Sequence, residues 1–307
     1  MDIFIQQLIN GLTLGSVYAV VALGYTMVYG IIQLINFAHG ELVMIGAMVA
    51  FTLIGVLVPT GMHPLLIVLI ATACAVPVCM LVGYAMERLA YRPLRRAPRL
   101  APLITAIGVS IILQHLALLA WSRNNLAFPQ IIRTESYHIG GATITNVQVA
   151  IMAMSVVMMA GLALLVYRTR LGTAMRATAQ NAQVAGLMGI DINRMISATF
   201  VIGAALAAVA GVMVGSYYGI AHYQMGALLG MKAFSAAVLG GIGNLPGAML
   251  GGLLLGVVEA LGAGYIGDLT GDVFGSNYQD VFAFLVLIAV LVFRPSGLLG
   301  ERVGDRA

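Results

Sequence analysis

Few side chains in this sequence have the type and setting that chemistry requires, and two charged ones lie within long apolar stretches. Glu259 stands in the middle third of one such stretch, and Lys232 is the only lysine of the chain. A carboxylate inside a membrane costs enough free energy that it indicates a functional site. The alternative is a structural ion pair, for which Lys232 is the candidate partner, and both interpretations stay open.

The other candidate ligands and acid–base groups do not form a site. His39 and Glu41 are two residues apart, so on a helix they face different ways, and no third metal ligand follows them. His115 is expected to be hydrogen-bonded between packed helices. Cys74 and Cys79 lie in one apolar run, where a disulfide would constrain little, and are expected to be packing residues.

Motifs of three enzyme classes are absent from the sequence. A phosphate-binding loop needs a lysine after a glycine-rich turn, but Lys232 stands in Leu-Leu-Gly-Met-Lys-Ala. Neither G-x-S-x-G nor H-E-x-x-H occurs. We therefore expect no catalytic site, no metal site and no cofactor in this chain.

The composition is that of a membrane protein. Apolar residues make up 61% and charged residues 8%, against about half and about a quarter in soluble domains. The net charge of +4 comes without a basic, aromatic-rich module, so we expect no nucleic acid partner. The chain has no basic residue before Arg88, so a cleaved signal peptide is not expected.

Arginines mark one side of the membrane, because cytoplasmic loops retain Lys and Arg. This asymmetry predicts cytoplasmic loops at 88–100 and 168–194, a cytoplasmic C-terminus, periplasmic loops at 122–146 and 267–279, and a periplasmic N-terminus. Twelve of the fourteen arginines form three clusters: Arg88, Arg92, Arg95, Arg96 and Arg99; Arg168, Arg170, Arg176 and Arg194; and Arg294, Arg302 and Arg306.

The elements that must position these residues are membrane-spanning helices, each of about 20 apolar residues. The fold class expected is an all-α polytopic bundle of about eight or nine such helices, forming one domain over 1–307 with halves at about 1–121 and 147–300. The stretch 226–244 is either a ninth span or a re-entrant segment. Spans are expected near 8–31, 41–58, 64–87, 101–121, 147–167, 195–217, 246–266 and 280–294.

Two polar breaks, at 35–41 and 240–247, occur at corresponding places in the two halves. This correspondence indicates an internal pseudo-repeat with interrupted helices. Each break leads into a glycine-rich span, and paired breaks of this kind point to a translocation site, because broken helices expose backbone groups to a cavity. Asn36 in the first break and Asn244 in the second either cap the helix that follows, present an amide to substrate, or do both. The candidate pathway residues are Asn36, Ala38, His39, Gly40, Glu41, Gly240, Gly241, Asn244, Pro246 and Glu259.

The loop 168–194 contains a short helical pattern. Small residues recur at helical steps from Ala174 to Gly189 and predict a smooth face, while Arg176, Gln180 and Asn181 offer polar contacts. Such a helix could enter a groove in a partner protein. The alternative is an interfacial helix that lies on lipid headgroups.

Three runs, 34–41, 87–95 and 237–248, carry a family resemblance. They read Leu-Ile-Asn-Phe-Ala-His-Gly-Glu, Glu-Arg-Leu-Ala-Tyr-Arg-Pro-Leu-Arg and Ala-Val-Leu-Gly-Gly-Ile-Gly-Asn-Leu-Pro-Gly-Ala. The chain resembles, nearly end to end, the LivH-type permease subunits of branched-chain amino acid ABC importers. Urea and short-chain amide permeases are similar through the same motifs.

The resemblance implies a multi-pass subunit of the bacterial inner membrane that carries leucine, isoleucine or valine. It implies a heterodimer with a second, related permease, two cytoplasmic ATPase subunits that bind ATP and Mg²⁺, and a periplasmic substrate-binding protein. A self-sufficient carrier or channel is the alternative class. A carrier would usually place several acidic or histidine side chains within its spans to bind Na⁺ or move protons, and this chain offers few, Glu259 and His115. The residues to which the resemblance gives an ATPase-coupling role are Arg176, Ala177, Ala182, Ala185, Gly186 and Gly189.

Overall fold

Helices account for nearly all of the secondary structure. The computed structural model describes residues 2–95, 97–98, 100–139, 141–270 and 278–300. Long apolar stretches form helices because a helix satisfies its own backbone hydrogen bonds where lipid offers none. The α-helices within the described ranges are α1 (Asp2–Ile32), α2 (His39–Leu57), α3 (Pro64–Ala85), α4 (Leu100–Ala120), α5 (Asn146–Arg168), α6 (Arg170–Gln180), α7 (Ala182–Leu187), α8 (Ile192–Tyr218), α9 (Met225–Gly240), α10 (Leu245–Thr270) and α11 (Gln279–Phe293).

Short elements extend or connect these helices. A 3₁₀ turn, η1 (Val58–Thr60), follows α2, while a π-helical turn, η2 (Met86–Tyr91), and a second 3₁₀ turn, η3 (Arg92–Leu94), continue α3. The strands form two antiparallel pairs, β1 (Leu126–Ala127) with β4 (Ile220–Ala221), and β2 (Ser136–Ile139) with β3 (Ala142–Thr145).

Seven helices in the described ranges are long and apolar enough to cross a membrane. They lie at the positions expected for the first seven spans, which confirms a helical, multi-pass membrane protein. The other two stretches form shorter helices. At 280–294, where a span was expected, α11 has 15 residues, and at 226–244, where a ninth span and a re-entrant segment were both left open, α9 has 16. At 1.5 Å per residue such helices reach only about 22–24 Å, less than the ~30 Å hydrocarbon core.

The chain divides into two compact units that each draw segments from both halves of the sequence. Unit 1 comprises Met1–Thr26, Thr134–Met159 and Lys232–Ala307, and unit 2 comprises Met27–Arg133 and Ala160–Met231. Each unit is described by itself.

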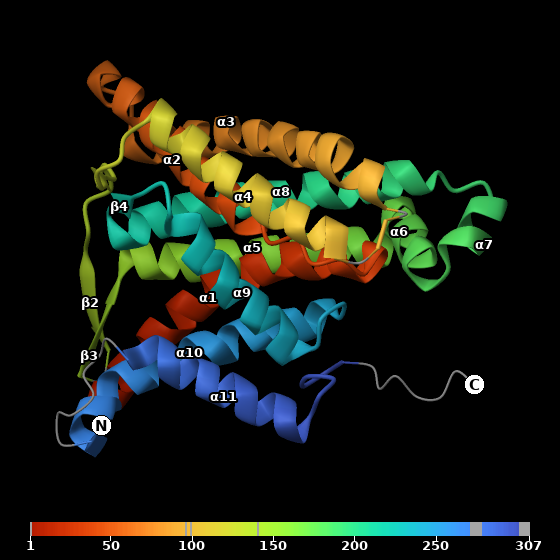
Figure 1. Ribbon diagram of the computed structural model, residues 1–307. Coiled ribbons are helices and arrows are strands. Elements are labelled where there is room, and N and C mark those ends of the chain that lie inside the picture. Colours follow the sequence, from red (N-terminus) through yellow and green to blue (C-terminus); the bar gives the residue numbers. More distant parts are fainter. Residues whose placement is uncertain (1, 96, 99, 140, 271–277, 301–307) are drawn as a thin grey trace. The chain divides into compact units, whose positions relative to one another are not determined.

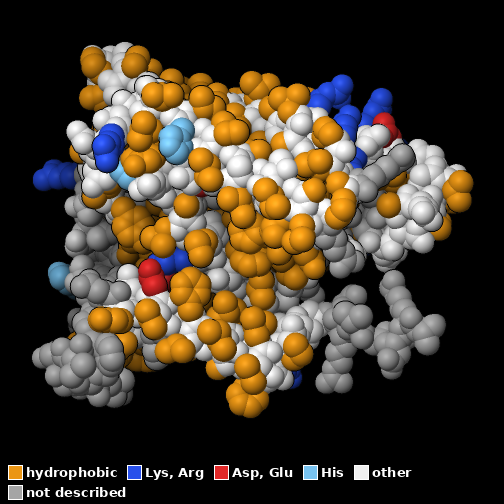
Figure 2. Space-filling view, in the orientation of Figure 1, with side chains coloured by type: hydrophobic (Ala, Val, Ile, Leu, Met, Phe, Trp, Pro, Cys, Tyr) orange, Lys and Arg blue, Asp and Glu red, His pale blue; other side chains and the backbone are white. Residues whose placement is uncertain are grey.

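In unit 2, α8 packs against α2 and α3, and α2 also contacts α4. Small residues bring two of these backbones together, since a Cβ on Gly211 would lie 2.1 Å from the Val43 carbonyl oxygen. Figure 1 shows α6 and α7 at the end of this unit where α8 begins. The outer faces of α3 and α4 expose large apolar side chains, such as Leu81 and Leu119, as a lipid-facing surface would. Figure 2 shows apolar side chains over much of the visible face.

In unit 1, α1 lies against α10 at a glycine contact. A Cβ on Gly256 would lie 2.2 Å from the Gly15 backbone nitrogen, and a Cβ on Gly252 would lie 2.4 Å from the Ala19 Cα. The β2–β3 hairpin is held by Gln6, whose side chain accepts from the Thr143 amide at 2.8 Å and donates to its carbonyl at 3.1 Å.

Candidate functional site

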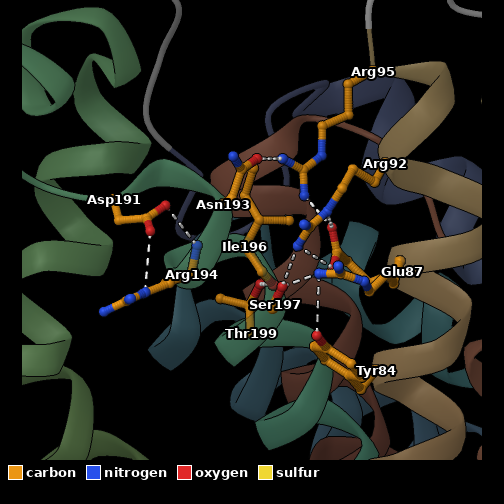
Figure 3. Close-up of polar contacts among 11 residues, drawn as sticks. Tyr84, Glu87, Arg92, Arg95, Asp191, Asn193, Arg194, Ile196, Ser197 and Thr199 are labelled. Atoms are coloured by element: carbon orange, nitrogen blue, oxygen red, sulfur yellow. Dashed lines mark hydrogen bonds and ion pairs between the residues drawn. The ribbon is translucent and has the colours of Figure 1, made fainter.

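A buried carboxylate at the end of α3 forms the most highly charged cluster in unit 2. Glu87 is fully buried in η2. Arg92 donates to it with two nitrogens, Nε to Oε1 at 3.2 Å and Nη2 to Oε2 at 3.1 Å, and Arg95 forms a second ion pair with Oε1. Figure 3 shows both guanidinium groups directed at this one carboxylate. Arginine suits the position because its planar group can donate two parallel hydrogen bonds.

The same cluster fastens α3 to the first turns of α8. Ser197 Oγ donates to Glu87 Oε2 at 2.7 Å, and Arg95 Nη1 donates to Asn193 Oδ1 at 2.6 Å. Burial lowers the pKa of Arg95 and the neighbouring Glu87 charge opposes that change. Removing one partner of such a buried pair leaves an uncompensated charge, so the junction is stiff.

Helix caps divide the loop at 168–194 into two helices. The Thr169 hydroxyl accepts from the Gly172 amide at 3.1 Å and begins α6. Asn181 is extended, with φ −156° and ψ 100°, and its side chain accepts from the Val184 amide at 3.0 Å to begin α7. Asp191 then caps α8. The prediction of one helix with one smooth face is therefore wrong, because Asn181 is a better N-cap than an interior helical residue.

The residues predicted to couple to an ATPase are not all on the surface. Arg176, Ala182, Gly186 and Gly189 are exposed, and the Arg176 guanidinium lies 5.6 Å from the centroid of the Tyr167 ring. Ala177 is half-buried, and Ala185 is only 4% exposed, which directs it into its own unit.

The exposed face of α7 and the residue after it are apolar instead. Val184, Leu187 and Met188 are 52%, 87% and 79% exposed, and we refer to them as the α7 apolar edge. The sequence analysis missed these residues because it looked for small side chains at helical steps. The sequence signal that could have found them is the presence of three large apolar side chains in a loop rich in arginine.

The first polar break lies in unit 2 and is buried. Asn36 and His39 are 2% and 1% exposed, and Ala38, Gly40 and Glu41 are also buried. Asn36 Oδ1 accepts from the Ala38 amide at 3.1 Å, which forms a tight turn rather than a side-chain cap of α2. It also accepts from the Tyr91 hydroxyl at 2.6 Å.

Glu41 is engaged by neutral donors from α4. Its Oε1 accepts from Ser110 Oγ and Gln114 Nε2, both at 2.8 Å. The first turn of α9 approaches closely, since a Cβ on Gly226 would lie 2.6 Å from Glu41 Oε2. Ser110 and Gln114 were not foreseen, because nothing in the sequence pairs positions about 70 residues apart.

The second polar break lies in unit 1. Gly240 packs against Gly247, and Gly241 has a φ of +105°, a conformation that favours glycine. Asn244 Oδ1 accepts from the Gly247 amide at 3.0 Å, so the capping interpretation is confirmed here, and its Nδ2 donates to the Leu299 carbonyl at 2.8 Å. Pro246 is exposed.

Glu259 forms an ion pair with Lys232, which was one of the two roles left open for it. Lys232 Nζ lies 2.7 Å from Glu259 Oε1 and 2.7 Å from Asp280 Oδ1, within 5.9 Å of the Tyr18 ring centroid. His115 was expected to be hydrogen-bonded between packed helices, and this prediction is wrong. The residue is exposed on α4, and its Nδ1 lies 2.8 Å from the carbonyl of Ile111 in the same helix.

Seven long apolar helices in the described ranges, a buried ion-pair cluster at the end of α3, an ion pair between α9 and α10, and an exposed two-helix loop define a polytopic membrane protein. The family model for the permease component of branched-chain amino acid transport systems matches residues 7–291. The chain belongs to this family, and it is accordingly a transport subunit and not an enzyme.

Named relatives are similar over almost the whole chain. The high-affinity branched-chain amino acid transport system permease protein BraD of Pseudomonas aeruginosa is 50% identical over 303 residues, 97% of this chain and 96% of that protein. The corresponding LivH of Escherichia coli K12 is 45% identical over 304 residues, with the same coverage. A probable LivH of Methanocaldococcus jannaschii is 26% identical, over 93% of this chain and 89% of that protein. No solved structure shows significant similarity to the chain.

Proposed function

We propose that this chain is the membrane-spanning subunit of an ATP-driven, binding-protein-dependent importer of leucine, isoleucine and valine. The names of its relatives at 45–50% identity support this substrate class. Transport would proceed by alternating access in the bacterial inner membrane, and ATP and Mg²⁺ would be bound by partner subunits. A second, related permease, two ATPase subunits and a periplasmic binding protein would complete the importer.

The orientation proposed follows from the arginine clusters. The loops at 88–100 and 168–194 and the C-terminus would be cytoplasmic, and the N-terminus and the loops at 122–146 and 267–279 periplasmic. Residues 271–277 of the last loop and the C-terminal residues 301–307 lie outside the described residues. The finer architecture is also a proposal: two pseudo-repeated halves, an eighth crossing at α11, and α9 either as a ninth crossing or as a re-entrant segment.

The substrate pathway would run past the two polar breaks. A branched aliphatic side chain needs apolar walls, and its charged ends need amides or backbone dipoles. Asn36, His39, Glu41 and Asn244 are the polar side chains among the residues proposed for these breaks. In a carrier driven by ions, Glu259 would need to be available, but Lys232 neutralises it. That ion pair favours an ATP-driven subunit over a self-sufficient carrier.

The single observation that carries the ATPase partnership is the α7 apolar edge. Three large apolar side chains exposed on a loop with arginines on either side would be covered by a partner's groove, since exposed apolar clusters mark interaction sites. Leu187, the most exposed of the three, is the expected anchor.

The test replaces Leu187 in the assembled importer. We expect Leu187→Asp to weaken ATPase binding by about 30-fold, the factor that corresponds to ~2 kcal/mol for an apolar anchor. Co-purification of the ATPase and ATP-dependent leucine uptake in proteoliposomes should both fall. Gln183→Glu, at an exposed polar position of the same helix, is the matched control and should leave both unchanged.

Normal ATPase binding and normal uptake by Leu187→Asp would show that α7 is not the docking element. A lower amount of permease in the membrane, with the ATPase still bound to the permease that remains, would instead support the lipid-headgroup interpretation of this loop.

A further inference from the structure

Two polar clusters of unit 2 meet in one short segment. Tyr91, the last residue of η2, donates its hydroxyl to Asn36 Oδ1 at 2.6 Å, and both side chains are 2% exposed. Glu87, in the first turn of the same segment, holds the ion pairs with Arg92 and Arg95. A π-helical turn is uncommon and is frequently found at functional sites.

On one side, η2 is fixed to the element that follows the α7 apolar edge. Ser197 donates to Glu87 and Arg95 donates to Asn193, both in the first turns of α8. Figure 3 shows these contacts beside Asp191, whose side chain caps α8 and pairs with Arg194 at 3.1 Å. Only Met188, Gly189 and Ile190 separate Asp191 from the end of α7.

On the other side, η2 is fixed to the polar break before α2. The Asn36 amide oxygen accepts from Tyr91 and from the Ala38 backbone at the same time, so the Tyr91 hydroxyl helps to hold the turn from which α2 begins. The ring of Tyr91 packs on Phe200 of α8, with the ring centroids 5.2 Å apart. A shift of the start of α8 would therefore move both the carboxylate and the phenol of η2.

We propose that η2 is the connector through which the docking loop controls the polar break at Asn36, with Glu87 and Tyr91 as its positioning residues. This proposal rests on the function proposed above. An ATPase that moves α7 would shift the start of α8, the Glu87 cluster would carry that shift into η2, and Tyr91 would carry it to Asn36. The contacts of Ser197 with Glu87 and of Tyr91 with Asn36 join buried groups, and only three residues connect α7 to Asp191. Packed contacts of this kind can have discrete arrangements.

The decisive variant is Tyr91→Phe, which removes the hydroxyl and keeps the ring against Phe200. In the complete importer, reconstituted with its ATPases and its binding protein, we expect ATP hydrolysis to stay within about twofold of the unaltered complex. Leucine moved per ATP hydrolysed should fall about five- to tenfold, the effect of one buried hydrogen bond. Tyr84→Phe, which removes a hydroxyl that accepts from the exposed Arg88 Nη1 at 3.3 Å, is the matched control and should leave the ratio unchanged.

A double-mutant cycle completes the test. Asn36→Ala should lower the ratio, and Tyr91→Phe in that background should lower it no further, because the bond is already lost. Independent, additive losses would overturn the proposal, as would an unchanged ratio in Tyr91→Phe. Parallel loss of assembly, hydrolysis and transport in Tyr91→Phe would also overturn it, since Tyr91 would then be only structural. None of these results touches the proposed function, which depends on the Leu187 experiment and on leucine uptake by the unaltered complex.

Discussion

Buried carboxylates in this permease are compensated in different ways. Glu87 has two arginines and Glu259 has Lys232, whereas Glu41 accepts hydrogen bonds from two neutral donors, Ser110 and Gln114. A carboxylate with a buried cation is expensive to separate from it, which suits a fixed junction. We therefore assign a structural role to the ion pair of Glu259 and a positioning role to the ion pairs of Glu87.

Replacing Lys232 tests this assignment at the level of one residue. Lys232→Met would leave Glu259, which is 2% exposed, without its cation, at a cost of about 3–5 kcal/mol for a broken buried pair. The thermal unfolding temperature of the purified complex should fall, and adding Glu259→Gln should restore most of the loss. An unfolding temperature that does not change in Lys232→Met would mean that the pair contributes nothing to stability.

At the scale of helices, glycines set how closely the elements approach. The contact of Gly256 with Gly15 brings α10 onto α1, and the contact of Gly211 with Val43 brings α8 onto α2. Close backbone approach of this kind drives helix association in membranes, where lipid removes the usual hydrophobic gain.

Adding one methyl group to α10 tests this packing. In Gly256→Ala the new Cβ would lie 2.2 Å from backbone, so α1 and α10 must separate and the unfolding temperature should fall clearly. Gly161→Ala is the matched control, because no atom lies within 4 Å of its new Cβ, and alanine favours the helix by about 1 kcal/mol. Equal behaviour of the two variants would argue against a close contact of α1 with α10.

Element positions were largely predictable from the sequence, whereas the contacts between elements were not. Long apolar runs located seven helices because length and hydropathy are local properties. The break at Asn181 was missed although asparagine favours helix starts, because the recurrence of small residues across it was given more weight. The Glu87 cluster joins residues about a hundred positions apart, and no local pattern announces such a contact. The ion pair of Lys232 with Glu259 was foreseen because each was the rare charge in its apolar stretch.

At the scale of the whole molecule, the proposed mechanism would convert movement of the exposed 168–194 loop into a change at the polar break at Asn36. The α7 apolar edge would provide the surface for a partner, and η2 lies between the helix that follows it and the turn before α2. Nothing in this scheme requires a catalytic group in the chain. The free energy would come from ATP hydrolysis by the partner. The ATPase would drive transport by making different contacts with two conformations of the permease.

Substrate uptake by the complete importer tests the central claim most directly. The purified complex is placed in proteoliposomes, with binding protein on the periplasmic side of the permease and ATP on the side of the ATPases. Labelled leucine should then accumulate on the side of the ATPases. Uptake should saturate, should require ATP, and should be reduced by excess unlabelled isoleucine or valine but not by urea or acetamide. Uptake of urea or an amide in place of leucine would contradict the proposed substrate class, and leucine uptake that continues without ATP would contradict an ATP-driven mechanism.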